Sequence, residues 1–142
     1  MQKHAPALLA ALALLSGETL AAPWIQVEIG KSVYAFELIE NDAARAFADR
    51  LPIRVRFEDY GSTERIAYLE PPLDIGTALA RTKPERGDIT YYAPWGNLAV
   101  FLKPFRTSEG LVALGKLPQE ALQAIESSGN SIVTFRQMEK KE

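Results

Sequence analysis

The sequence predicts one small, mostly β domain: a closed barrel of about eight strands with two short helices. Short runs rich in Val, Ile, Tyr and Phe alternate with polar residues, which is the pattern of half-buried strands. Most runs are separated by hairpin-length turns rather than by the long crossovers of parallel sheets. A sheet assembled from hairpins avoids exposed edges by closing on itself, and helices can then cover the open ends.

The first two strands are expected to form a hairpin. Residues 24–29 alternate between apolar and polar side chains, and a second β-rich run covers 32–38. Gly30 stands in the two-residue turn between them. Glycine suits that position because the tight turns of hairpins require positive φ angles.

A short helix is expected next, over 41–50. Asn41 is a residue type that caps helices, and the charge of Asp42 is favourable at a helix amino terminus. Phe47 lies on the apolar face of this segment. Pro52 ends the helix, because the residue before a proline avoids helical backbone angles.

Two further strands and an irregular segment follow. Residues 53–58 alternate strictly between apolar and charged side chains, so one face of this strand is buried. A turn around 59–62 leads to a shorter strand over 65–69. Three prolines, a glycine and mixed charges make 70–86 an irregular excursion over the barrel surface, with room for a helical turn at 76–80.

The carboxyl-terminal half returns to the β-rich pattern. Two aromatic-rich strands run through 89–102 and are joined by a turn of the sequence Pro-Trp-Gly-Asn. Strands are also expected over 111–116 and 131–137. Between these two, Pro118 at the first helical position begins a second short helix, which ends before Gly129.

The amino-terminal segment 1–21 is expected to be a signal peptide that is removed on export. A short polar start precedes nine apolar residues at 7–15, and small residues follow. A bilayer span needs roughly 20 apolar residues, so no stable membrane span is expected after cleavage. Cleavage after Ala21 is favoured, since cleavage one residue later sets Pro23 beside the scissile bond. A single domain, 22–142, would then act in the periplasm or as a secreted protein.

Composition excludes several kinds of active site. The chain has no cysteine, and its one histidine, His4, leaves with the signal peptide. Zinc sites built on Cys or His, Ser-His-Asp or Cys-His nucleophiles and histidine acid–base catalysis are therefore not expected. No calcium-loop spacing is present, so no metal site and no cofactor are predicted. A formal net charge of −2 without a basic block argues against nucleic acid as a partner.

Several segments resemble one known family. The most specific is 87–101, GDITYYAPWGNLAVF, supported by 41–47, 57–60 and 111–117. Together they resemble the small prokaryotic cyclophilin-like domain family, over roughly 25–135. The resemblance implies a cyclophilin-type closed barrel flanked by two helices, and it implies no particular reaction.

True cyclophilins are peptidyl-prolyl isomerases with a catalytic arginine beside a phenylalanine-rich wall that contains glutamine. Their Phe-His-Arg and Gln-Gly-Gly-Asp segments do not occur in this chain, so no catalytic residue is carried over. Arg54, Arg56 and Arg65 are the arginines on or beside strands that could border a groove. The ordinary interpretation of these three is a solvated face paired with Glu58 and Glu64.

Aromatic residues around the Pro-Trp-Gly-Asn turn form the candidate ligand site. Tyr91 and Phe101 are expected in the core, because half of the side chains on alternating strands must face inward. Pro94 and Gly96 suffice to turn the chain, so the ring of Trp95 has a further role, either covering the barrel or contacting a ligand. The side chain of Asn97 either contacts a ligand or only hydrogen-bonds to the backbone of the turn. The predicted ligand-contacting side chains are Arg56, Tyr92, Trp95 and Asn97.

Two functional classes follow from these observations. In the first, the exported domain binds a small molecule or an extended peptide at the barrel mouth without chemistry. In the second, it is a divergent periplasmic peptidyl-prolyl isomerase. The missing isomerase segments favour binding and argue against an enzyme. An interaction module that packs against a partner protein is a third possibility, which the sequence does not separate from the first.

Overall fold

The computed structural model describes residues 23–138, so the predicted signal peptide lies outside the described residues. Within these residues there are two short helices, α2 (Asp42–Asp49) and α3 (Gln119–Ser127). No helix within 23–138 has the length and apolar character needed to cross a membrane. The strands are β1 (Trp24–Ile29), β2 (Ser32–Glu37), β3 (Ile53–Tyr60), β4 (Glu64–Tyr68), β5 (Arg81–Thr82), β6 (Asp88–Tyr92), β7 (Asn97–Phe101), β8 (Ser108–Glu109), β9 (Leu111–Lys116) and β10 (Ser131–Gln137).

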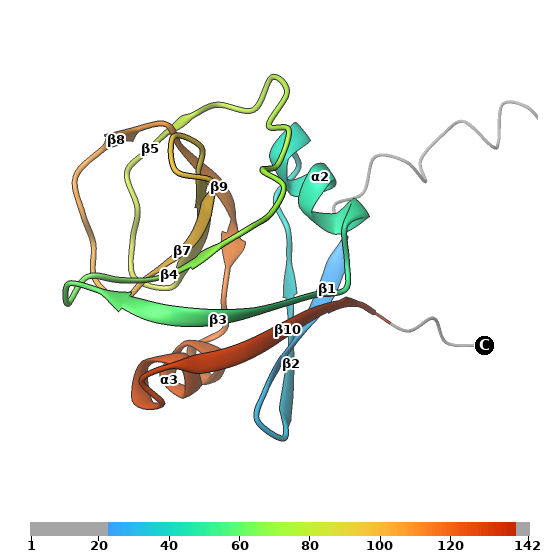
Figure 1. Cartoon of the computed structure of the whole chain (residues 1–142), viewed down its shortest axis with the longest axis vertical. Coiled ribbons are helices and arrows are strands. Elements are labelled where there is room, and N and C mark those ends of the chain that lie inside the picture. Colours follow the sequence, from blue (N-terminus) through green and yellow to red (C-terminus); the bar gives the residue numbers. More distant parts are fainter. Residues whose placement is uncertain (1–22, 139–142) are drawn as a thin grey trace, which may run out of the picture.

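Eight of these strands form one antiparallel sheet in the order β2-β1-β10-β3-β4-β7-β6-β9, curled into a nearly closed barrel (Figure 1). A bridge between Leu38 and Gly115 joins the two edges of the sheet. A Cβ on Gly115 would lie 2.9 Å from the carbonyl oxygen of Glu37, so only glycine permits this close approach. The predicted mostly β barrel with two helices is confirmed.

The local signals for α2 act as predicted. Asn41 caps the helix, because its Oδ1 accepts a hydrogen bond from the backbone N–H of Ala44 at 2.7 Å. Its Nδ2 donates to the carbonyl oxygen of Ala113 at 3.0 Å, which ties the start of the helix to β9. Pro118, expected as the first helical residue, is instead the N-cap of α3, so this helix begins one residue later than predicted.

Two segments differ from the sequence-based expectation. Strand β3 continues to Tyr60, because Asp59 and Tyr60 pair with Arg65 and Glu64 of β4, and the turn moves later in the chain. The helical turn expected at 76–80 does not form. There the backbone N–H and hydroxyl of Thr77 both donate to the carboxylate of Asp42, each at 2.8 Å, and these tertiary bonds hold the segment against α2.

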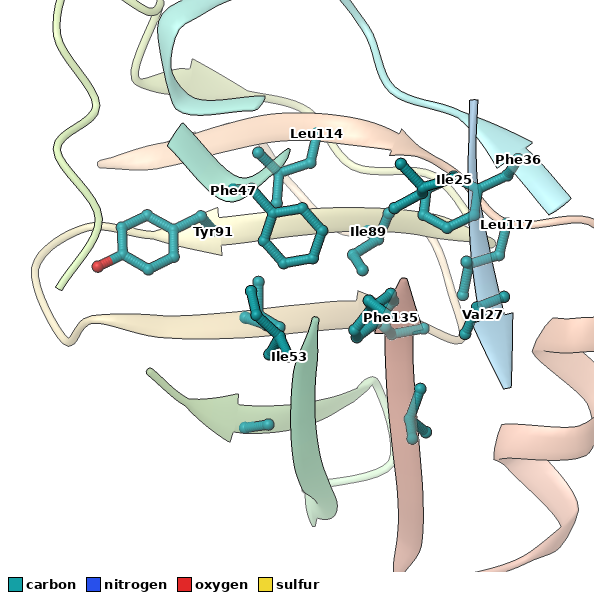
Figure 2. Close-up of a cluster of buried hydrophobic side chains, with 14 of the residues drawn as sticks. Ile25, Val27, Phe36, Phe47, Ile53, Ile89, Tyr91, Leu114, Leu117 and Phe135 are labelled. Atoms are coloured by element: carbon teal, nitrogen blue, oxygen red, sulfur yellow. The ribbon is translucent and has the colours of Figure 1, made fainter. Parts of the chain in front are cut away.

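The interior of the barrel is packed with apolar side chains from both helices and the main sheet. Figure 2 shows part of this core, with Phe47 of α2 among side chains of the strands. Phe135 of β10 lies at its centre and meets three other rings edge to face. Its ring centroid is 5.3 Å from that of Phe47 and 6.5 Å from those of Phe36 and Phe57. The interior of the barrel is therefore a filled core.

Arg65 has a structural role that the sequence interpretation missed. Its side chain is buried rather than solvated, and it hydrogen-bonds the last carbonyl groups of α3. Nη1 donates to Ile125 O at 2.7 Å and to Gly129 O at 3.0 Å, and Nη2 donates to Glu126 O at 2.9 Å. Its Nε also lies 2.5 Å from a carboxylate oxygen of Asp59. A cation at a helix carboxyl terminus satisfies carbonyl groups that the helix leaves unpaired.

Candidate functional site

The candidate site is a cleft of about 270 Å³ on the outer face of the barrel. Along β7, Leu98 and Val100 point into the main core, whereas Ala99 and Phe101 belong to a separate apolar cluster on the opposite face. The cleft lies over this second cluster. Its floor consists of the outward side chains Ile66, Tyr92, Asn97, Phe101 and Leu111.

Strand register brings residues that are distant in the sequence together at this cleft. Tyr60 of β3 pairs with Glu64 of β4, and Glu64 pairs with Phe101 of β7. Tyr92 of β6 pairs with Asn97 of β7 and with Leu111 of β9. Directly paired residues have their Cβ atoms about 5 Å apart, so two rows of side chains cross the floor of the cleft.

One wall comes from the segment between β7 and β8. The ring of Phe105 stacks on that of Phe101, with the centroids 6.4 Å apart and the planes inclined by 26°. The guanidinium carbon of Arg106 lies 4.4 Å from the centroid of Phe105. The backbone N–H of Phe105 donates to Pro84 O at 3.1 Å, so the excursion 70–86 anchors this wall.

A second wall comes from the turn between β6 and β7. Trp95 is 50% exposed, and its ring centroid lies 5.7 Å from that of Tyr60 and 5.5 Å from that of Tyr92. The interplanar angles are 79° and 76°, so the rings form corners rather than a stack. Gly110 supports this turn from below: its φ is +86°, and a Cβ there would lie 2.7 Å from the ring of Pro94.

Two polar groups in the cleft are incompletely paired. Asn97 is 2% exposed, and its Nδ2 donates to Leu98 O at 3.0 Å, but its Oδ1 accepts no hydrogen bond from residues 23–138. Glu64 is half-buried, and this burial raises the pKa of its carboxyl group. Glu64 forms no ion pair with the described part of the chain. Buried polar atoms without partners are uncommon in proteins and costly, so both groups are suited to meet a ligand.

The structure brings together three of the four predicted site residues. Tyr92, Trp95 and Asn97 line the cleft, whereas Arg56 does not. Arg56 is exposed on β3 opposite Ile132 of β10, and it lies four residues before Tyr60, roughly 13 Å along the strand. The ring of Trp95 packs outside the main core, so it covers part of the outer face rather than the barrel interior.

Sequence reasoning missed Tyr60, Glu64, Phe105 and Arg106 as lining residues. Tyr60 was assigned to a turn, and Phe105 and Arg106 lie in an irregular segment with no periodicity to assign them to a face. One signal was present: Asn97, Ala99 and Phe101 alternate with Leu98 and Val100, so the two sets must face opposite sides of the sheet. The core assignment of Tyr91 is confirmed, and Phe101 is buried but in the outer cluster.

A second hollow of about 250 Å³ lies elsewhere on the surface and is lined by Arg54 together with Arg50, Tyr68 and Glu70. Arg50 is already engaged there, since its guanidinium donates to the carbonyl groups of Pro71 and Pro72. Among residues 23–138, no group of three or more His, Asp or Glu side chains is arranged to hold a metal ion. The outer cleft is therefore the stronger candidate site.

Comparison with known families agrees with the architecture. A family model described as the cyclophilin-like family matches residues 27–136, which span β1 to β10. The chain belongs to the cyclophilin-like family. The resemblance inferred from 87–101 and its supporting segments is thus confirmed over nearly the whole described chain.

A solved structure with the same cyclophilin-like fold is the solution structure of a hypothetical protein from Archaeoglobus fulgidus. It superposes with a TM-score of 0.58 and 17% sequence identity, covering 86% of this chain and 99% of that one. At this identity the similarity shows the fold alone. A search of curated protein sequences finds no match.

Proposed function

We propose that this cyclophilin-like domain binds a small ligand, or one short part of an extended peptide, in the outer cleft and does not alter it chemically. The observation that carries the proposal is the composition of the cleft: half-exposed aromatic walls surround the unpaired amide oxygen of Asn97 and the half-buried carboxylate of Glu64. Concave sites with mostly apolar walls and a few convergent polar groups are typical of ligand pockets. A volume of about 270 Å³ suits a small molecule or one or two peptide side chains.

The chemical groups in the cleft favour binding over catalysis. Glu64 is the single carboxylate among the lining residues, so acid–base chemistry with two carboxylates has no second member there. Ser108 also lines the cleft, but the residues around it include no histidine or lysine that would activate its hydroxyl group. The lining residues are therefore better suited to orient a ligand than to react with it.

Tryptophan fluorescence provides a direct test, because the chain has two tryptophans and only Trp95 lines the cleft. A Trp24→Phe variant reports on Trp95 alone, and Trp95→Phe is the matched control that reports on Trp24. Benzyl alcohol, which absorbs at shorter wavelengths than tryptophan, and N-acetyl-alanyl-proline amide serve as an aromatic and a peptide probe. A saturable change in the first variant and no change in the second are expected for at least one probe. If neither probe changes Trp95 emission, or if both variants respond equally, the cleft is not the binding site.

One observation favours divergent peptidyl-prolyl isomerase activity as a second candidate function. Arg106 lies over Phe105, which stacks on Phe101, so an arginine stands beside a phenylalanine wall in the cleft. A prolyl isomerisation assay tests this candidate, with Arg106→Ala as the variant and the remote Arg56→Ala as its control. Under the binding proposal neither variant nor the parent accelerates isomerisation. Acceleration that is lost in Arg106→Ala and retained in Arg56→Ala would establish the isomerase function instead.

We propose further that the domain acts after export, in the periplasm or as a secreted protein, with cleavage after Ala21. The polar start, the nine apolar residues at 7–15 and the small residues before the cleavage point support this. Amino-terminal sequencing of the exported protein should begin at Ala22. An intact Met1, or a start within β1, would contradict the proposal.

A further inference from the structure

Three rings that meet around Trp95, those of Tyr60, Tyr92 and Trp95 itself, expose aromatic surface to the cleft. Tyr60 and Trp95 are 48% and 50% exposed, and Tyr92, which also forms part of the floor, is half-buried. The rings of Tyr60 and Tyr92 each pack nearly perpendicular to the ring of Trp95. The face of an aromatic ring carries partial negative charge, so a pocket bounded by several rings attracts a cation.

The wall between β7 and β8 already contains one contact between a cation and a ring. The guanidinium of Arg106 lies 4.4 Å from the centroid of the Phe105 ring, so an aromatic face of this cleft is compatible with a positive charge. Arg106 is exposed and forms no ion pair with Glu64 among the described residues. It therefore does not neutralise the carboxylate in the cleft.

Glu64 differs in how its charge is compensated from Glu28, the other half-buried glutamate of residues 23–138, and from two exposed glutamates. Glu28, Glu109 and Glu126 each form an ion pair with an arginine from another segment. Glu64 is half-buried beside Tyr60 and Phe101, yet no cation of residues 23–138 pairs with it. Removing a carboxylate from water is unfavourable unless an opposite charge compensates it, so this group suits a cation supplied by a ligand.

Asn97 adds a hydrogen-bond acceptor to the cleft besides the carboxylate of Glu64. Asn97 Oδ1 is buried and unpaired, and its orientation is set because Nδ2 donates to Leu98 O. A group that donates N–H bonds and carries a positive charge satisfies this oxygen, the Glu64 carboxylate and the aromatic rings together. An anionic ligand would find one cation in the cleft, the exposed Arg106, and would otherwise meet two acceptors and the electron-rich faces of the rings.

We propose that the ligand of the outer cleft carries a protonated alkylamine, which the rings of Tyr60, Tyr92 and Trp95 surround while Glu64 and Asn97 accept its N–H bonds. This inference rests on the proposed ligand-binding function and specifies the chemistry of the ligand. A free amine and a lysine side chain of a peptide offer the same butylammonium group, so the shared chemistry is an alkylammonium ion.

The test compares two probes of the same length, butylamine, which is protonated at neutral pH, and the neutral 1-butanol. Titrations are followed by the backbone amide signals of 92, 93 and 95–97 in nuclear magnetic resonance spectra of the mature domain. Butylammonium is expected to bind about tenfold more tightly than 1-butanol, since cation–π and charge interactions act only on the cation. N-acetyl-lysine methylamide distinguishes the source: tighter binding than butylamine indicates a peptide, and weaker binding indicates a free amine.

Substitution of Glu64 and a change of pH distinguish the contribution of the carboxylate to binding from that of the rings. Glu64→Gln should remove most of the preference for butylammonium, whereas Glu58→Gln, at an exposed position outside the cleft, should leave it unchanged. Because burial raises the pKa of Glu64, butylammonium binding should weaken as the pH falls through that raised pKa, and the Glu64→Gln variant should not show this change. The other titratable side chains lining the cleft are Tyr60, Tyr92 and Arg106.

The outcomes distinguish this inference from the proposal beneath it. If 1-butanol binds as tightly as butylamine and shifts the same amide signals, the cation inference is wrong while the cleft remains a binding site. If benzyl alcohol or the proline peptide changes Trp95 emission but butylamine shifts no cleft signal, the inference is again wrong and the binding function stands. If none of these probes affects the cleft, both are overturned.

Discussion

The two faces of the same strands are built for different purposes. On the inward face of β7, Leu98 and Val100 are fully buried in the main core around Phe135. On the outward face, Phe101 is buried but lies under an open cleft. The inward face carries apolar side chains that pack against one another, whereas the outward face carries half-exposed rings and acceptors without partners. Because neighbours on a strand alternate between faces, residues that stabilise the fold and residues suited to recognition stand next to each other in the sequence.

The largest effect is expected from the inward face. Phe135→Ala removes the ring that contacts three others, and it should lower the free energy of unfolding by about 3–5 kcal/mol. Phe105→Ala truncates the same residue type on the half-buried outer wall and should cost clearly less. Denaturant unfolding of both variants measures the difference. Equal losses would show that the outer wall is as important for folding as the core.

A smaller loss of stability is expected where buried carbonyl groups lose their hydrogen-bond donor. Arg65→Met leaves carbonyl groups of α3 without their donor and should cost about 2–3 kcal/mol. Asp59→Asn is the control, because Asp59 is mainly exposed and its ion pair with Arg65 should contribute less than about 1 kcal/mol. Unfolding free energies of the two variants test this order, and a larger loss for Asp59→Asn would assign the stabilisation to the ion pair.

The outward face should tolerate truncation. Trp95→Ala is expected to lower stability by about 1 kcal/mol, because half of the ring is already exposed and its main partners are two aromatic edges. Trp24→Ala is a matched control, since Trp24 is 54% exposed on β1 and lies outside the cleft. Both variants should unfold at similar denaturant concentrations, but only Trp95→Ala should lose binding of the probes. A large stability loss with unchanged binding would reject Trp95 as a site residue.

The smallest expected effect is a gain in stability rather than a loss. Burial raises the pKa of Glu64, so the charged carboxylate opposes folding at neutral pH, and Glu64→Gln should slightly raise the melting temperature there. As the pH falls through the raised pKa of the folded protein, Glu64 takes up a proton and the advantage of the variant should disappear. Thermal unfolding across this pH range measures the effect. A stability advantage of Glu64→Gln that persists in acid would show that its origin is not the buried charge.

Local sequence signals predicted the elements well because their causes are local. The alternation in 53–58 and 131–137, the capping side chain of Asn41 and the glycine turn at Gly30 each depend on neighbouring residues, and all four appear in the structure. Arg65 could not be assigned in this way, since its partners on α3 lie about 60 residues further along the chain. The very short strands β5 and β8 carry too few residues for any periodicity.

The candidate site was predicted in part for the same reason. Tyr92, Trp95 and Asn97 belong to one hairpin, so a single turn places them together. Arg56 was expected to join them because it lies on an outward strand face, but its position along β3 leaves it outside the cleft. The wall formed by Phe105 and Arg106 depends on a long-range hydrogen bond between Phe105 and Pro84.

The sequence by itself determined the class of fold, the number of main strands, the two helices and the family, because periodicity, caps and turn residues express local backbone preferences. It also shows that residues 22–142 contain neither histidine nor cysteine. Only the tertiary structure decided which side of the barrel carries the cleft. That choice depends on the filled interior and on strand register, which pairs Tyr60 with Glu64 and Glu64 with Phe101. Pairings between separate segments are set by how the whole chain packs, and no local pattern encodes them.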